Sequence, residues 1–193
     1  MNRVDRLLVV LLWTVSVLVV AGITHIAAIL FYPKTVSLER FSQISKLAEP
    51  GQIAPLPFAE PGEQPLPFAD PAVAQSICPF DLSRGGLRLH ADVEAGRLLT
   101  LSFHTSDGEI FYSMSDRGAQ QGKIDVVVLT PSQLELVQAD DDEDNPSPDL
   151  RLIAPANAGF VIISALAPHP SEKGEARYRA QSVACSIERL AGS

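Results

Sequence analysis

The sequence predicts an α+β protein in which an N-terminal transmembrane helix is followed by one β-rich, sandwich-like domain with short terminal helices. Residues 7–32 contain no Asp, Glu, Lys or Arg, and an uncharged run of that length can cross a bilayer as a helix. Beyond Gly86, short segments alternate apolar and polar residues, as half-buried strands do. Apolar residues at helical spacing flank that region, so we expect a sheet-based core with a helix at each end.

The apolar run is better explained as a retained anchor than as a cleaved signal peptide. A helix over residues 7–32 is roughly 39 Å long at about 1.5 Å per residue, whereas the apolar region of a signal peptide is typically about 7–15 residues long. His25 lies inside the run, beside Thr24. We expect a neutral imidazole that contacts water or headgroups rather than a proton carrier. The lipid bilayer is therefore a predicted partner, through residues 7–32.

The positive charges around the helix do not decide its direction. Arg3 and Arg6 precede it, and three more cations follow within the range in which the positive-inside rule counts, namely Lys34, Arg40 and Lys46. Moving a short tail with two arginines across the membrane is unfavourable, whereas long domains cross largely regardless of charge. We therefore expect a cytoplasmic tail (1–6) and a domain (71–193) outside the inner (plasma) membrane, in the periplasm of a Gram-negative cell.

A juxtamembrane helix and a proline-rich connector are predicted over residues 33–70. Ser37 begins a stretch with apolar residues at helical spacing, and Pro50-Gly51 ends it. The sequence PLPFAEP at 55–61 then recurs as PLPFADP at 65–71, and its prolines favour an extended path. We interpret the repeat as a semi-rigid spacer whose two phenylalanines pack on the domain; the alternative is a docking strap for a partner.

The domain itself is predicted from periodicity and turn signals. Asp70-Pro71 is typical of a helix start, so a short helix is expected over 72–78, ended by Pro79. A second short helix is expected over 132–138, and the helical spacing of the C-terminal residues from Ser171 onward predicts a last helix that carries Cys185. Between these helices we predict strands over 87–93, 97–104, 109–114, 124–129, 150–153 and 159–166.

The two cysteines lie near the two ends of the domain. If the domain is exported, Cys78 and Cys185 could form one disulfide that closes a long loop and ties the last helix to the first. The alternative is a pair of buried free thiols. Because there is no CxxC pair, no zinc site is predicted.

The charge of the chain excludes one class of partner. The net charge is −8, and a negative domain is repelled by phosphate backbones, so we expect no nucleic acid partner. No Walker or dinucleotide fingerprint is present, so no cofactor is predicted.

Four stretches resemble a known family: GITHIAAIL (22–30), LPFADPAVAQSICPFDLS (66–83), FYSMSDRGA (111–119) and VLTPSQL (128–134). They resemble small alphaproteobacterial single-pass membrane proteins, which are themselves similar to part of larger envelope proteins grouped as a domain of unknown function, the family numbered twelve-fifty-four. The resemblance covers most of the chain. It implies a membrane-anchored β-rich domain and transfers no catalytic residue.

The most site-like segment is FYSMSDRGA, which places an aromatic ring, a carboxylate and a guanidinium at the end of a strand, namely Tyr112, Asp116 and Arg117. Binding residues often gather in loops at such positions, and Arg117 could bind a carboxylate or phosphate on a ligand. The alternative is a turn network in which Asp116 and Arg117 pair with each other.

The remaining polar features carry weaker predictions. The acidic run 140–144 lacks the alternating ligands and central glycine of a calcium loop, so we expect a solvated hairpin tip. His90 and His104 fall on the polar faces of adjacent predicted strands, so they could be neighbours, but no GxSxG motif supports a hydrolase. We therefore predict no catalytic residue and a non-enzymatic module that contacts another envelope protein or a small ligand. The alternative is a periplasmic, hydrolase-like enzyme with a site near Tyr112–Arg117.

Overall fold

The fold is taken from a computed structural model, which describes residues 2–44, 46–59, 69–94, 96–139 and 149–189. The chain divides into two compact units, Met1–Glu39 and Arg40–Ser193. Each unit is described by itself below.

The first unit is formed by the helix α1 (Arg3–Ile44) up to Glu39. Its part Arg3–Phe31 is long and apolar enough to cross a membrane. Three hydroxyl groups inside this apolar stretch donate to carbonyl oxygens four residues earlier, so none depends on water: Thr14 to Val10, Ser16 to Leu12 and Thr24 to Val20. The backbone remains helical from the apolar stretch through the predicted start of the juxtamembrane segment at Ser37 and as far as Ile44, so this segment continues the long helix.

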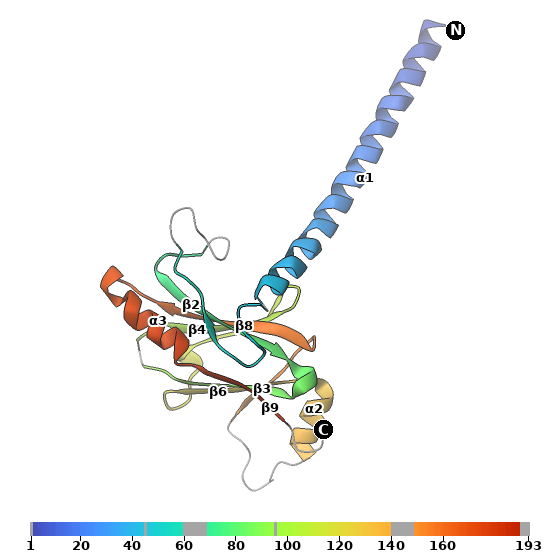
Figure 1. Cartoon of the computed structure of the whole chain (residues 1–193). Helices are drawn as coiled ribbons and strands as arrows, with labels where there is room; N and C mark the ends of the chain where they lie inside the picture. The colour runs from blue at the N-terminus through green and yellow to red at the C-terminus, as the bar shows by residue number, and fades with distance from the viewer. Residues whose placement is uncertain (1, 45, 60–68, 95, 140–148, 190–193) are drawn as a thin grey trace. The chain divides into compact units, whose positions relative to one another are not determined.

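The second unit is a two-sheet sandwich, which confirms the predicted fold class (Figure 1). One sheet has the order β1-β2-β8-β4-β5, and the other has the order β7-β6-β3-β9. All neighbouring strands are antiparallel except β6 and β7. The strands are β1 (Ala54–Pro55), β2 (Val73–Asp81), β3 (Gly86–Asp92), β4 (Leu99–Thr105), β5 (Ile110–Ser115), β6 (Lys123–Leu129), β7 (Leu150–Ile153), β8 (Ala158–Leu166) and β9 (Ala184–Glu188).

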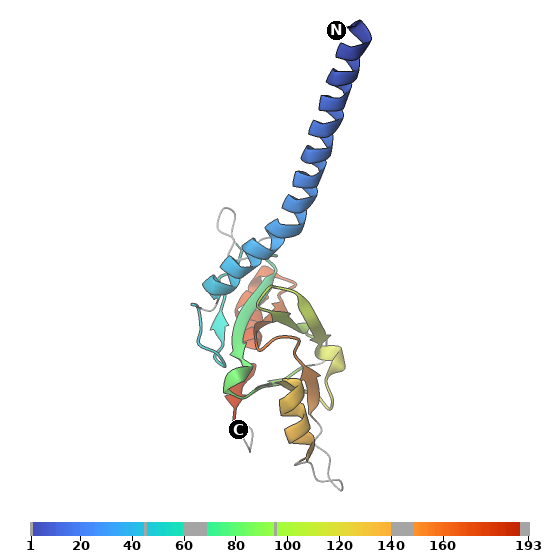
Figure 2. The same cartoon turned by 90° about the vertical axis from the view of Figure 1, so that its right-hand side faces the viewer.

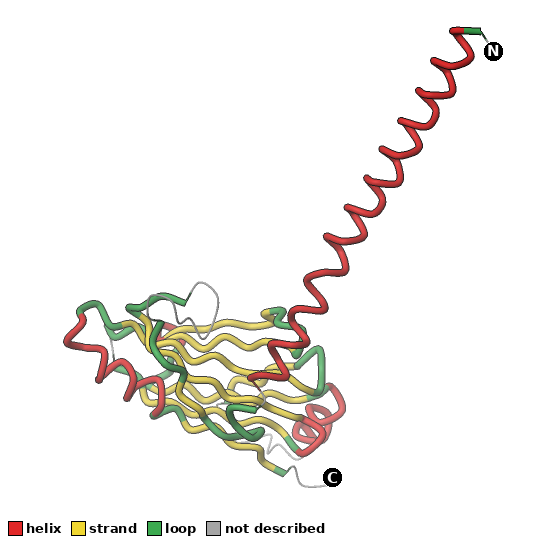
Figure 3. Tube along the Cα trace, turned by 45° about the horizontal axis from the view of Figure 1, so that its top comes forward, coloured by secondary structure: helices red, strands yellow, loops and turns green. Residues whose placement is uncertain are grey.

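The core lies between the two sheets and follows the predicted alternation. In β4, residues 99, 101 and 103 are buried while 100, 102 and 104 are partly exposed, as expected for a strand with one face against a core. Two short helices, α2 (Pro131–Ala139) and α3 (Lys173–Gln181), lie at opposite ends of the strand layers (Figure 3). Ala176 and Ala180 of α3 are fully buried in the core.

The predicted helix over 72–78 is wrong, because this segment is the strand β2. Asp70 does not cap a helix; its carboxylate accepts a hydrogen bond from the amide of Ala72 at 2.8 Å and closes a turn. The chain then pairs with β8 over nine residues. Pro79 is compatible with this strand because β1 begins at Ala54, opposite Ile77, so no residue of β1 lies opposite Pro79 and needs an amide donor from it.

The predicted C-terminal helix is only half right, because α3 ends at Gln181 and Cys185 lies on the strand β9. After Ser182 the apolar residues change to a period of two, with Val183, Cys185 and Ile187 directed inward and the residues between them exposed. Positions 176, 180, 183 and 187 fit helical spacing, but the last two also fit a strand, and pairing with β3 decides between them.

The connection between β6 and β7 is a crossover and not the predicted hairpin. Because the two strands are parallel, the chain must return along the sheet, and it does so through α2 (Figure 2). Thr130 begins α2 with reciprocal bonds, since its hydroxyl accepts from the amide of Gln133 and its amide donates to the Gln133 side chain. The acidic run 140–144 lies outside the described residues.

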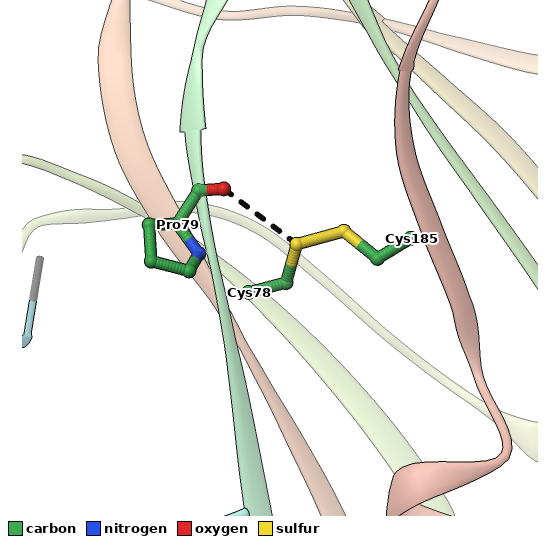
Figure 4. Close-up of a disulfide and its surroundings, with 3 residues drawn as sticks. All are labelled: Cys78, Pro79 and Cys185. Atoms are coloured by element: carbon green, nitrogen blue, oxygen red, sulfur yellow. Dashed lines mark hydrogen bonds between the residues drawn. A yellow bond between two sulfur atoms is a disulfide. The ribbon is translucent and has the colours of Figure 1, made fainter. Parts of the chain in front are cut away.

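The predicted disulfide between Cys78 and Cys185 is present, and it joins the two sheets (Figure 4). Cys78 lies on β2 and Cys185 on β9, with their Cα atoms 6.7 Å apart. The connector also contacts both sheets near the disulfide. The amide of Gly51 donates to the carbonyl of Pro79 on β2, and Gly51 lies against Ile187 of β9. We call this side of the sandwich, where β1 and β2 face β9, the closed end.

The first copy of the repeated proline-rich segment packs on the domain as predicted. β1 pairs with β2, and the ring of Phe58 lies under two cations of α3, 4.9 Å from Lys173 Nζ and 4.8 Å from the Arg177 guanidinium carbon. Leu56 belongs to a second apolar cluster on the outer face of the five-stranded sheet, with Ile77 and Phe160. Phe68, in the second copy, lies outside the described residues.

Candidate functional site: a cavity at the open end of the sandwich

An edge strand of each sheet lies on the side opposite the disulfide: β5 of the five-stranded sheet and β7 of the four-stranded sheet. We call this side the open end. A cavity of about 460 Å³ opens there between the two sheets. We call it the edge cavity. Its lining comes from β5, from the turn that leads into β6, and from the first residues of β6 and β7: Tyr112, Met114, Gly118, Gln120, Gln121, Lys123, Ile124, Asp125 and Leu150. Its apolar side chains come from both sheets, Met114 from one and Ile124 and Leu150 from the other, and five of the nine residues carry polar groups on their side chains.

The position of Leu150 in this wall is fixed by the residue before it. Asp149 accepts a hydrogen bond from Arg88 of β3 at 2.8 Å, and Arg88 also donates to Glu188 of β9 at 2.8 Å. The bond to Glu188 is the main reason that the pKa of Arg88 is raised, and burial opposes it. This ion-pair network lies on the outer face of the four-stranded sheet and ties β3 and β9 to the residue directly before β7.

A tight turn with an uncommon backbone conformation forms one wall of the edge cavity. Gln120 and Lys123 exchange two backbone hydrogen bonds, of 2.9 and 3.0 Å. The two residues between them both have positive φ, 53° at Gln121 and 77° at Gly122, as a type I′ turn requires. Among the described residues Gln121 is the one non-glycine with positive φ. Such residues concentrate at functional sites.

Replacing Gln121 with asparagine is expected to stabilise the protein by up to about 1 kcal/mol, because the left-handed conformation costs most side chains roughly 1–2 kcal/mol and asparagine much less. Gln120→Asn is the matched control, since Gln120 has no positive φ. Thermal denaturation of the two variants in detergent micelles measures the difference. Equal melting temperatures would contradict the assignment of the strain to Gln121.

Of the three site residues predicted from the sequence, the structure brings one into the edge cavity. Tyr112 lines the edge cavity from β5. Asp116 and Arg117 lie in the short 3-10 helix that follows β5 (Asp116–Gly118), outside the lining. The predicted Asp116–Arg117 ion pair is not formed among the described residues; Asp116 Oδ1 is buried without a hydrogen-bond partner there, and Arg117 is exposed.

His90 and His104 are not neighbours, because they lie in different sheets. His90 is on β3, where its Nδ1 lies 2.5 Å from the carboxylate of Asp125 on β6. It also lines a second cavity of about 270 Å³ that Ser182 shares. The hydroxyl of Ser182 donates to the carbonyl of Arg179 at 3.0 Å rather than to the imidazole. The prediction of a hydrolase-like site near Tyr112–Arg117 therefore stays a prediction.

His104 is half-buried on the outer face of the five-stranded sheet. Its ring stacks on Phe160 with the centroids 4.8 Å apart. Its Nδ1 lies 3.3 Å from the carbonyl of Gly108 and its Nε2 3.1 Å from the hydroxyl of Ser102. A neutral ring with its proton on Nδ1 satisfies both contacts. Burial lowers the pKa of His104, and the bond to Gly108 opposes that shift.

We expect the domain to lose stability as the pH falls from about 7.5 to about 5.5, because the folded state holds His104 neutral while the unfolded chain takes up a proton. The loss begins near the ordinary pKa of 6.5 and continues down to the lowered pKa of the folded state. The variant His104→Gln, which cannot take up that proton, should show a smaller loss. Melting temperatures at the two pH values measure this. An unchanged pH dependence in the variant would contradict it.

Sequence reasoning missed most of the edge cavity. Lys123, Asp125 and Leu150 are far from FYSMSDRGA along the chain, and only the facing of β5 against β6 and β7 brings them to Tyr112. One signal was present: Gly122, directly before an apolar, β-branched strand, is compatible with the second central position of a two-residue turn. A turn of this kind at the start of β6 indicates residues 120–125 as a further candidate for the binding site.

These features define a class: a chain with one helix suited to crossing a membrane and a disulfide-linked two-sheet sandwich. No protein-family model and no curated protein matches it. Several solved structures are similar, and two of them are described here. The VPA0106 protein from Vibrio parahaemolyticus has a TM-score of 0.56 and 10% sequence identity, over 81% of this chain and 36% of that one. An uncharacterised protein from Burkholderia cenocepacia has a TM-score of 0.47 and 9% identity, over 81% of this chain and 41% of that one.

The likeness to the Vibrio protein shows the fold alone, because the sequences are only 10% identical. The chain also spans little more than a third of that protein's length. The fold is thus one that occurs within a larger chain, and the function has to be argued from the site.

Proposed function

We propose that this protein is a membrane-anchored envelope protein whose β-rich domain lies on the periplasmic side and binds a partner or ligand at the edge cavity. The observation that carries the binding function is the edge cavity itself. It lies between two terminal strands, and among the described residues no strand covers either of them. Concave sites with an apolar lining and a few polar groups are the usual place for binding.

The location outside the cytoplasm is supported by two independent features. Disulfides form and persist in oxidising compartments and are rare in the cytosol, and the Cys78–Cys185 bond joins the two sheets of this domain. The N-terminal tail carries Arg3 and Arg6 directly before the apolar stretch, and moving that tail across the membrane is unfavourable. Both features favour an inner-membrane protein with a cytoplasmic N-terminus.

The asymmetry of the sandwich supports binding at one end only. The closed end is covered by the connector and joined by the disulfide. At the open end, Leu150 is 38% exposed on the rim of the edge cavity although it is a large apolar side chain. An exposed apolar rim around a cavity is the kind of surface that a partner covers.

Site-specific photo-crosslinking in cells tests this proposal. A photoreactive phenylalanine analogue placed at Leu150 should form a light-dependent adduct with whatever occupies the edge cavity. The same analogue at Tyr178, which is 71% exposed on α3 and does not line the edge cavity, is the control. No adduct at position 150, or equal adducts at both positions, would contradict binding at the edge cavity.

A further inference from the structure

The strand β5 presents a free edge. It is the last strand of its sheet, and among the described residues no other strand pairs with its outer side. The backbone amides and carbonyls on that side are a ready template for another strand. Natural proteins usually protect such edges with charged residues or proline, but the sequence of β5, IFYSMS, has neither.

The edge cavity lies directly behind this edge. Tyr112 and Met114 of β5 line it, while Ser113 between them is exposed on the other face. Because side chains alternate along a strand, a new strand beside β5 would direct every second side chain toward the edge cavity. There it would meet Ile124 and Leu150 from the other sheet. The inward side chain that fits this environment is therefore apolar.

Two cations lie on the segment that leads from the end of β5 to the start of β6. Arg117 follows the strand and is exposed, and Lys123 is exposed in the lining of the edge cavity. Among the described residues neither forms an ion pair. The nearby carboxylate of Asp125 is bound to His90. In a chain with a net charge of −8, this is a place where an acidic group on a partner would be favoured.

We propose that β5 and the edge cavity bind an extended peptide segment of another envelope protein by strand addition. One apolar side chain of the segment occupies the edge cavity, and an acidic residue lies beside Arg117 and Lys123. In strand addition, main-chain hydrogen bonds supply affinity and a pocket for alternate side chains supplies specificity. This inference rests on the proposed function, since it names the occupant of the same cavity.

Phage display of short random peptides on the full-length protein in lipid nanodiscs tests the inference. Enriched peptides should alternate apolar with other residues and contain an acidic one. Met114→Lys should weaken their binding about tenfold or more, because it places an unpaired charge in the edge cavity. Tyr178→Lys, at an exposed position of α3, should leave binding unchanged. If Met114→Lys does not fold, Leu150→Trp, which fills the edge cavity from its rim, takes its place.

The charged contact has its own test in the same assay. Exchanging Arg117 and Lys123 together for serine should weaken the binding of the acidic peptides. The loss of affinity should be larger at low salt, because salt screens the attraction between exposed charges. Versions of the peptides with the acidic residue replaced by serine should bind both proteins equally. Equal binding of the acidic peptides to both proteins would remove the charged contact from the inference.

Three outcomes would overturn strand addition by a partner. One is the absence of any enriched peptide family, and another is enriched peptides that bind the Met114→Lys variant equally well. The third is a concentration-dependent dimer in light scattering that Met114→Lys abolishes, because the occupant is then a second copy of this chain. If these tests fail while photo-crosslinks from Leu150 persist, the binding function of the edge cavity stands and only its occupant is wrong.

Discussion

Replacing Cys78 and Cys185 together with alanine is expected to lower the free energy of unfolding of the sandwich by about 4–5 kcal/mol. The bond closes a loop with a sequence separation of 107 residues, and in the chain-entropy model a loop of about 100 residues contributes about 4.7 kcal/mol. Cys78 is also fully buried, so its truncation removes core contacts as well. This loss is a large fraction of the total free energy of unfolding of a typical domain, which is about 5–15 kcal/mol.

Pulse proteolysis of the full-length protein in detergent micelles, across a urea series, measures this loss. The one tryptophan, Trp13, lies in the apolar stretch of α1, so its fluorescence is not a suitable probe for the sandwich. Reductant added to the wild-type protein should lower the urea midpoint to nearly that of the double variant. A midpoint that neither change moves would contradict a disulfide that holds the sheets together.

Truncating Phe103 to alanine is expected to cost about 3–5 kcal/mol, the usual cost for a fully buried phenylalanine. Phe103 has no exposed surface and lies on β4 in the middle of the core. Its ring centroid is 6.1 Å from that of Phe111 and 6.0 Å from that of Tyr112. Its loss therefore also removes packing behind the wall of the edge cavity.

Leu89→Ala separates the two effects of that truncation. Leu89 is equally buried but lies on β3 of the other sheet, and it does not line the edge cavity. Both variants should lower the urea midpoint, since core truncations of leucine cost about 2–5 kcal/mol. Only Phe103→Ala should also reduce photo-crosslinking from Leu150 under conditions in which the protein is folded. Equal crosslinking in both variants would show that Phe103 does not position Tyr112.

The strands inside the sandwich could be predicted because their pattern is local. In β3, from Leu87 onward, and in β4 each buried residue alternates with a more exposed one, and two-residue periodicity has few competing explanations. In β6 the continuous apolar run matches continuous burial from Val126 to Leu129. The two segments predicted as helix that are strands, at 72–78 and after Gln181, fall where a helix signal overlaps the strand signal. In both places pairing with a distant strand decides the conformation, namely with β8 for the first and β3 for the second.

The edge cavity could be predicted only in part. Tyr112 was recognisable because an aromatic residue near charged ones at the end of a strand is typical of binding sites. Lys123, Asp125 and Leu150 were not, because their position depends on how the two sheets stack. The parallel pairing of β6 with β7 was also unpredictable from the acidic run between them, which favoured a hairpin. Local pattern identifies strands, whereas a site between sheets is a property of the assembled sandwich.

The central proposal is that the β-rich domain (71–193) lies outside the cytoplasm, because the disulfide and the choice of partner both depend on it. Two fusions test it directly: residues 1–60 are joined either to alkaline phosphatase or to green fluorescent protein. Alkaline phosphatase is active only outside the cytoplasm, and green fluorescent protein exported through the general pathway does not fluoresce. We predict an active phosphatase fusion and a dark fluorescent-protein fusion at that position. An inactive phosphatase together with a bright fluorescent fusion would contradict the account.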